Sequence, residues 1–200
     1  MAKSRFLKVA VFLLLIGVTA SVSAQVTISA GFALSSMEAK YGSTSFSGET
    51  GVGGNVYVDY LLPIGVPLSL GVEFGVDAAS VEDTTGGVTT KVEGTAIPLL
   101  VRAAYHFDLF PSLDLYAVGK IGYVLGSAEA YGTTESGYNG VGFGIDLGAA
   151  YYISSNFGFF LEAGFDQYNA EKEFTAYDGT TFTVEVPFTR FLTFGISAKF

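Results

Sequence analysis

A period of two runs through most of the chain after its first 24 residues. In the segment 68–77, leucine, valine and phenylalanine occupy every second position, with serine, glycine, glutamate and aspartate between them. Successive side chains of a β-strand point to opposite faces, so this pattern predicts a strand with one apolar face and one small or polar face. Seven further segments alternate in the same way. The eight predicted strands are 27–34, 55–62, 68–77, 97–107, 115–125, 141–151, 159–166 and 188–200.

The connections between these segments alternate strictly in length. Three are short, at about 63–67, 108–112 and 154–156, and four are long, at about 36–53, 79–95, 126–140 and 169–186. In an up-and-down barrel this alternation places all short turns and both termini at one mouth and all long loops at the other. The sequence therefore predicts an all-β fold, an eight-stranded antiparallel up-and-down β-barrel.

The apolar face of each segment carries most of the large side chains, among them Phe74, Leu147, Phe188 and Phe194. A soluble barrel would show the same alternation, but the interior of an eight-stranded barrel is barely wide enough for side chains to fill. The opposite face is mostly small, with single charges that are costly in hydrocarbon. Aromatic residues also gather near both ends of the segments, with aliphatic residues between them. These features predict a transmembrane barrel with its apolar face toward lipid.

The N-terminus has the layout of a secretory signal peptide. Lys3, Arg5 and Lys8 precede a short apolar run, and Val22 and Ala24 occupy the two positions that a signal peptidase recognises. The apolar run is about half of the ~20 residues that a membrane-spanning helix needs. We therefore expect residues 1–24 to be cleaved and residues 25–200 to form one barrel domain.

Composition limits the classes of partner and site. The chain has no cysteine, which excludes disulfides and cysteine-based metal sites. Its formal net charge of −9 argues against nucleic acid, because phosphate binding requires lysine and arginine. No cofactor is expected.

Six charged residues are predicted to face the lumen and form a network that closes the barrel. The alternative is a gated ion path, because charges also line narrow channels. A buried charge without a partner is costly, so Arg102 and Lys120 are expected to bridge the acids. Arg190 falls on the apolar face, where it is expected to extend toward a strand end, and Phe191 is expected to point inward. The predicted network comprises Asp59, Glu73, Arg102, Lys120, Asp146 and Glu162.

No catalytic site is predicted. His106 is the only histidine, and it is expected to point inward near the mouth with the short turns, as a hydrogen-bonded rim residue. A histidine with a serine is one signature of a hydrolase, but no lipid substrate of the outer leaflet lies at that mouth. The glycine clusters around 51–54 and 140–144 lack the Gly-Lys-Ser/Thr ending of a phosphate loop. The sequence thus predicts a protein that is not an enzyme.

The four long connections are acidic and contain aromatic residues. They are interpreted as solvated hairpin tips or as a contact surface for a cationic partner, either a host protein or divalent cations. The acids lack the spacing of a Ca²⁺ loop, so no metal is assigned. The acids are Glu38, Glu49, Glu82, Asp83, Glu93, Glu129, Glu135, Glu171, Glu173, Asp178 and Glu185, and the bases are Lys40, Lys91 and Lys172.

The final segment, Phe191-Leu192-Thr193-Phe194-Gly195-Ile196-Ser197-Ala198-Lys199-Phe200, alternates up to a C-terminal phenylalanine. In this respect residues 25–200 resemble the small eight-stranded outer-membrane barrels of the OmpX and OmpA transmembrane-domain type. The resemblance implies a monomer in the outer membrane of a Gram-negative bacterium, inserted by the barrel-assembly machinery. It implies that the signal for this machinery consists of Phe194, Ile196, Ala198 and Phe200.

Members of this family are variously anchors, adhesion or evasion proteins, narrow pores and a few lipid-modifying enzymes, so the fold does not fix the function. A structural or surface-interaction role, with a possible extracellular protein partner at the loops, is the first expectation. A narrow channel for small solutes or ions is the second, and a lipid-modifying enzyme of the outer membrane is the third.

Overall fold

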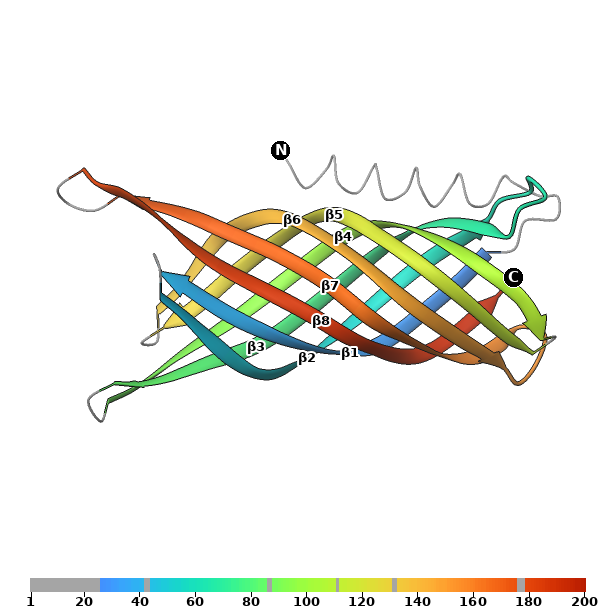
Figure 1. The fold of residues 1–200 in the computed structure, drawn as a ribbon, viewed down its shortest axis with the longest axis horizontal. Coiled ribbons are helices and arrows are strands. Elements are labelled where there is room, and N and C mark those ends of the chain that lie inside the picture. The colour runs from blue at the N-terminus through green and yellow to red at the C-terminus, as the bar shows by residue number, and fades with distance from the viewer. Residues whose placement is uncertain (1–25, 42–43, 86–87, 111, 131–132, 176–178) are drawn as a thin grey trace.

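Eight antiparallel strands close into one barrel in sequence order, with β1 paired to both β2 and β8 (Figure 1). The structure is a computed structural model that describes residues 26–41, 44–85, 88–110, 112–130, 133–175 and 179–200. The predicted eight-stranded up-and-down barrel is confirmed, whereas the predicted signal peptide lies outside the described residues. The strands are β1 Val26–Tyr41, β2 Thr44–Leu61, β3 Leu68–Thr85, β4 Val88–Phe110, β5 Leu113–Ala130, β6 Thr133–Tyr152, β7 Phe157–Thr175 and β8 Thr181–Lys199.

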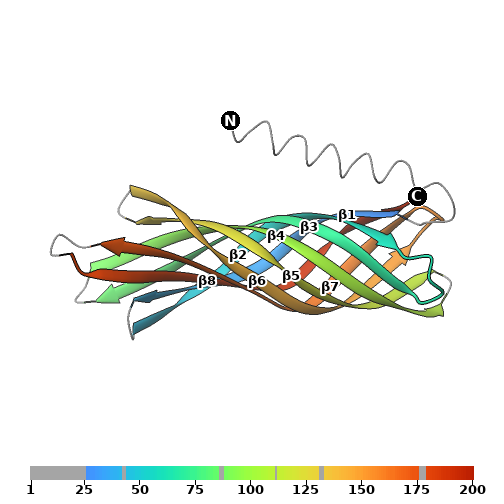
Figure 2. The same cartoon turned by 90° about the horizontal axis from the view of Figure 1, so that it is seen from above.

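The two ends of the barrel differ. One end has the connections between β2 and β3, between β4 and β5, and between β6 and β7, together with the start of β1 and the end of β8 (Figures 1 and 2). There the N–H of Val26 donates to the carbonyl of Phe200, and the N–H of Phe200 donates to the carbonyl of Val26. These two bonds close the ladder between the first and last strands. We call this end the turn mouth.

At the other end the structure corrects the predicted long loops. Most of these residues belong to strands, because the ladders continue until Tyr41 pairs with Thr44, Thr85 with Val88 and Ala130 with Thr133. A period of two in hydropathy arises where the two faces of a strand meet different environments, here lipid on one side and the lumen on the other. Hydrogen-bonded strands that continue beyond the bilayer therefore lack this sequence signal. We call the segments 36–53, 79–95, 126–140 and 169–186 the hairpin arms; they extend beyond the barrel wall in Figures 1 and 2.

Large apolar side chains cover the outer face of the barrel, as predicted. Phe32 is 70% exposed, Leu147 is 69% exposed and Ile145 is 74% exposed. A soluble protein rarely exposes a continuous apolar surface of this kind, whereas a lipid-facing wall requires one. None of the described segments is a helix long and apolar enough to cross a bilayer.

The inner face is fuller than the sequence analysis predicted, because aromatic rings enter the lumen opposite glycines. A Cβ atom added at Gly148 would lie 2.2 Å from ring carbons of Tyr116. The missing side chain at Gly148 therefore makes the space that the Tyr116 ring occupies.

A β-bulge in β8 corrects three predicted orientations. Against β1, the register passes directly from the pair Leu34–Leu192 to the pair of Ser35 with Arg190, so Phe191 is an extra residue. One extra residue exchanges the two faces of the strand beyond it. Arg190 and Phe188 were predicted on the lipid face but are buried inside the barrel, and Phe191 was predicted to point inward but is exposed outside.

Candidate functional site

The interior of the barrel consists of three layers. The inward residues of β4 pass through all of them, from Ala104 near the turn mouth through Arg102 to Leu100 toward the hairpin arms. The layer nearest the turn mouth is an aromatic cluster, the middle layer is charged, and the third is an apolar cluster. The aromatic cluster contains Tyr57, Ala104, Tyr116, Val118, Ala150 and Phe160.

Arg102 holds three acids in the charged layer. Its guanidinium lies 2.6 Å from Glu162, 3.2 Å from Glu73 and 3.1 Å from Asp59. Its carbon Cζ also lies 3.5 Å from the ring centroid of Tyr57, so the guanidinium packs directly on the aromatic cluster. Arg102 is fully buried, so each of these charge-assisted contacts replaces hydration that the guanidinium has lost.

Lys120 holds four acids beside it. Its ammonium lies 2.7 Å from Asp146, 3.1 Å from Asp166, 3.2 Å from Glu162 and 3.5 Å from Glu73. In the ladder between β4 and β5, Lys120 pairs directly with Arg102. Two bases at such close range repel each other, and Glu73 and Glu162, which each contact both bases, offset this repulsion.

The network also contains three residues that the sequence analysis did not assign to it, namely Asp77, Asp166 and Arg190. Arg190 lies 2.6 Å from Asp77, also bonds to Glu73, and lies 3.8 Å from Asp166. Asp77 and Asp166 continue the inward alternation of their strands, so the period of two would have placed them in the lumen. Arg190 carries no such signal, because the bulge beside it reverses the pattern.

The structure thus brings all six predicted network residues together and adds three. Among the described residues the layer contains six carboxylates and three bases, all of them buried. Glu73 lies at its centre, where it contacts all three bases and accepts a hydrogen bond from the Asn55 amide at 3.0 Å. Carboxylates from β2, β3, β6 and β7 meet bases from β4, β5 and β8, so the ion pairs connect opposite walls of the barrel.

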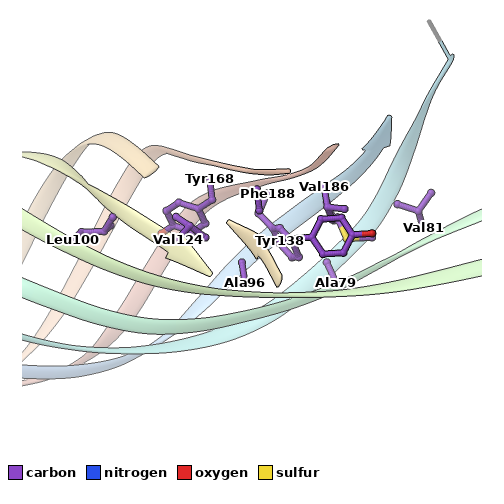
Figure 3. Close-up of a cluster of buried hydrophobic side chains, with 11 residues drawn as sticks. Ala79, Val81, Ala96, Leu100, Val124, Tyr138, Tyr168, Val186 and Phe188 are labelled. Atoms are coloured by element: carbon purple, nitrogen blue, oxygen red, sulfur yellow. The ribbon is translucent and has the colours of Figure 1, made fainter. Parts of the chain in front are cut away.

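The apolar cluster fills the lumen between the charged layer and the hairpin arms (Figure 3). Leu100, Val124 and Tyr168 lie toward one end of the cluster, and Val81 lies at the other end. The Tyr168 hydroxyl donates to Asp166 at 3.4 Å, so the first end adjoins the charged layer. Phe188 is fully buried within it because of the bulge in β8. The remaining members are Met37, Ala79, Ala96, Tyr138, Ala170 and Val186.

A cavity of about 160 Å³ lies at the turn mouth. Ser69 Oγ lies 2.9 Å from His106 Nε2, and His106 Nδ1 lies 2.9 Å from Asp114 Oδ1. The Lys199 ammonium lies 3.3 Å from Asp114 Oδ2 and 3.9 Å from the ring centroid of Tyr152. His106 is therefore a hydrogen-bonded residue of the mouth, as predicted, but its partners form a pattern that the sequence analysis did not anticipate.

The predicted assembly signal lies on the last strand. Phe194 and Ile196 are exposed on the outer face of β8, and Phe200 follows the strand at the turn mouth. Ala198 pairs with Ile28 of β1 at the closing seam. Recognition of these residues by the assembly machinery stays a prediction. Among the described residues, no group of three or more His, Cys, Asp or Glu side chains is arranged to hold a metal ion.

Comparison with known proteins gives one family and several related structures. No curated protein sequence matches the chain. The outer membrane protein OprG from Pseudomonas aeruginosa has a TM-score of 0.57 at 12% identity, over 88% of this chain and 96% of that chain. A major outer membrane protein from Thermus thermophilus has a TM-score of 0.55 at 18% identity, over 90% of this chain and 100% of that chain.

Neisserial surface protein A has a TM-score of 0.51 at 17% identity, over 90% of this chain and 98% of that chain. At these identities the likeness shows the fold alone. The family described as outer membrane protein beta-barrel domain matches residues 10–189, which is most of the chain. The closed barrel with its lipid-facing wall agrees with this match, and the chain belongs to the outer membrane protein beta-barrel domain family.

Proposed function

We propose that this protein is a closed outer-membrane anchor whose hairpin arms bind a basic protein partner at the cell surface. The observation that carries the proposal is that two cross-strand pairs in the arms place like charges directly opposite each other. Glu93 pairs directly with Glu129 between β4 and β5, and Glu171 pairs directly with Glu185 between β7 and β8. All four side chains are exposed.

These pairs cost stability. Like charges directly opposite each other on neighbouring strands destabilise a sheet. A cationic partner converts the same pairs into attractive sites, because each then presents two carboxylates to one basic group. A binding role therefore explains acids that the fold itself does not need.

The lysines of the arms whose side chains are described already have partners. The Lys91 ammonium lies 2.8 Å from Glu93, and its hydrogen bond with Glu93 raises the pKa of Lys91. The Lys172 ammonium lies 2.8 Å from Glu135 and donates a second hydrogen bond to the Ser136 carbonyl at 2.8 Å. These two lysines offset only part of the negative charge of the arms, and the remainder attracts a basic partner.

A test uses the purified barrel in nanodiscs of zwitterionic lipid and an oligolysine peptide as the probe. Changing Glu93, Glu129, Glu171 and Glu185 together to glutamine is expected to weaken peptide binding at least ten-fold at low salt, because exposed charge attraction is lost. The control variant Lys91→Gln leaves all acids in place and is expected to bind the peptide slightly more tightly. Equal binding by the wild type and the quadruple variant contradicts the proposal.

The closed lumen is the second part of the proposal, and it stands against the alternative of a narrow channel. The charged layer joins opposite walls, and the apolar cluster fills the space beyond it. An ion entering the lumen therefore meets charged side chains that are already paired with each other, and then a segment lined by apolar side chains. We expect the purified protein to show no steady conductance in planar bilayers at moderate voltage. A stable open level would contradict the closed anchor and favour the channel.

A further inference from the structure

The turn mouth holds a serine, a histidine and an aspartate in one hydrogen-bonded line. Asp114 carries only acceptors when ionised, so the His106 Nδ1 atom that faces it at 2.9 Å carries the proton. In the neutral imidazole, Nε2 is then an acceptor, and the hydroxyl of Ser69 donates to it at 2.9 Å. This tautomer prepares Nε2 to remove the proton of the Ser69 hydroxyl.

Three neighbouring strands hold this line in place. Ser69 lies on β3, His106 on β4 and Asp114 on β5, and all three side chains line the same cavity. The backbone N–H of His106 donates to the carbonyl of Pro67 at 2.8 Å, and the imidazole packs against the Tyr116 ring with centroids 5.5 Å apart. The backbone hydrogen bond and the ring packing fix the orientation of the His106 imidazole in advance, so no entropy is lost in orienting this base when the reaction occurs.

The surrounding cavity limits what enters. Its volume of about 160 Å³ suits an acyl group of a few carbons rather than a lipid chain, and it opens at the turn mouth rather than at the lipid-facing wall. Among the residues that line the cavity, Lys199 is the lysine or arginine. We propose that Ser69 is an acyl-accepting nucleophile for short-chain acyl esters that enter through the turn mouth, with His106 as its base and Asp114 as a positioning residue.

The reaction balances without any co-reactant but water. Ser69 Oγ attacks the ester carbonyl, His106 Nε2 takes the hydroxyl proton and returns it to the alcohol oxygen as the C–O bond breaks, and an acyl-serine remains. Water, activated by the same nitrogen, then releases the carboxylic acid and restores Ser69. The Lys199 ammonium lies 3.3 Å from Asp114 and so favours the ionised carboxylate that orients His106.

The experiment measures covalent labelling of the full-length protein, folded in detergent, by a small fluorophosphonate, with intact mass as the readout. Attack by Ser69 displaces fluoride, and the proton passes to His106, so the wild type is expected to gain one phosphonyl group. Ser69→Ala should gain none. Ser29→Ala is the matched control, because Ser29 is also a buried lumen serine, bonded to Ser197 at 3.0 Å, and should label like the wild type. Labelling that survives in Ser69→Ala, or an unlabelled folded wild type, overturns the proposal.

Two further variants separate chemistry from structure. His106→Gln should lower the labelling rate at least 100-fold, and Asp114→Asn should lower it and shift its pH profile, which a purely structural role would not do. Both variants should also hydrolyse p-nitrophenyl acetate more slowly than the wild type.

A cysteine variant tests access to position 69. The chain has no cysteine, so Ser69→Cys introduces a single thiol, which should react with iodoacetamide. A folded Ser69→Cys protein that resists iodoacetamide shows that position 69 is closed to small reagents and overturns the proposal independently.

Discussion

Replacing Lys120 with methionine is expected to lower the free energy of unfolding by about 3–5 kcal/mol, the usual cost of removing one partner from a buried charge pair. The ammonium lies within 3.5 Å of four carboxylates. Methionine has a similar length but no ammonium, so Asp146 loses the base it contacts, and Glu73, Glu162 and Asp166 each lose one of theirs. Reversible unfolding by urea in lipid vesicles measures the loss.

A control separates this effect from the general effect of losing a lysine. Lys91 also pairs with an acid, Glu93 at 2.8 Å, but both side chains are about half exposed in a hairpin arm. Solvent screens such a pair, so Lys91→Met is expected to leave the unfolding midpoint nearly unchanged. If Lys120→Met and Lys91→Met unfold alike, the charged layer does not stabilise the barrel.

The position of these charges follows from the sequence, but their pairing does not. A period of two is enough to place Glu73, Arg102 and Glu162 in the lumen, because hydrocarbon excludes them from the other face. Which acid meets which base depends on the register between strands. The direct pairing of Arg102 with Lys120, for example, depends on the turn between β4 and β5 and on the register shift between Phe107 and Phe110.

The turn mouth illustrates the same limit. Inward alternation places Ser69 and His106 in the lumen, whereas Asp114 lies just before the predicted strand 115–125 and was assigned no orientation. Their meeting depends on how far each strand is shifted along its neighbour, which alternation alone leaves open. One sequence signal could have revealed this hydrogen-bonded row of Ser69, His106 and Asp114. All three residues lie close to the short turns, where neighbouring strands are held in register.

The predictions of long loops and of the side-chain orientations around Phe191 were wrong for a different reason. Alternation arises where the two faces of a strand meet different environments, so it disappears in the arms although the backbone ladders continue. At Phe191, β8 has one more residue than the strand it pairs with. The apolar pattern continues through this position, so the sequence gives no sign of the bulge. Errors of this kind concern one strand face and do not alter the barrel.

The second large effect is expected at Phe188. Period two alone places its ring toward lipid, whereas the structure buries it completely in the apolar cluster beside Met37 and Tyr168. Phe188→Ala should therefore leave an internal cavity and lower the free energy of unfolding by about 3–5 kcal/mol. Urea unfolding in lipid vesicles measures this loss.

Phe191→Ala is the matched control, because it removes the same kind of ring from the opposite face of the same strand. The Phe191 side chain is 40% exposed on the outer wall, so lipid fills the space and the loss should be smaller. The chain has no tryptophan, so Phe188→Trp and Phe191→Trp each introduce a single tryptophan, whose emission can be excited apart from the tyrosines. Brominated lipids should quench the tryptophan at 191 and not the one at 188. The reverse order of quenching would show that β8 has no bulge, and Arg190 could then no longer reach Asp77 inside the lumen.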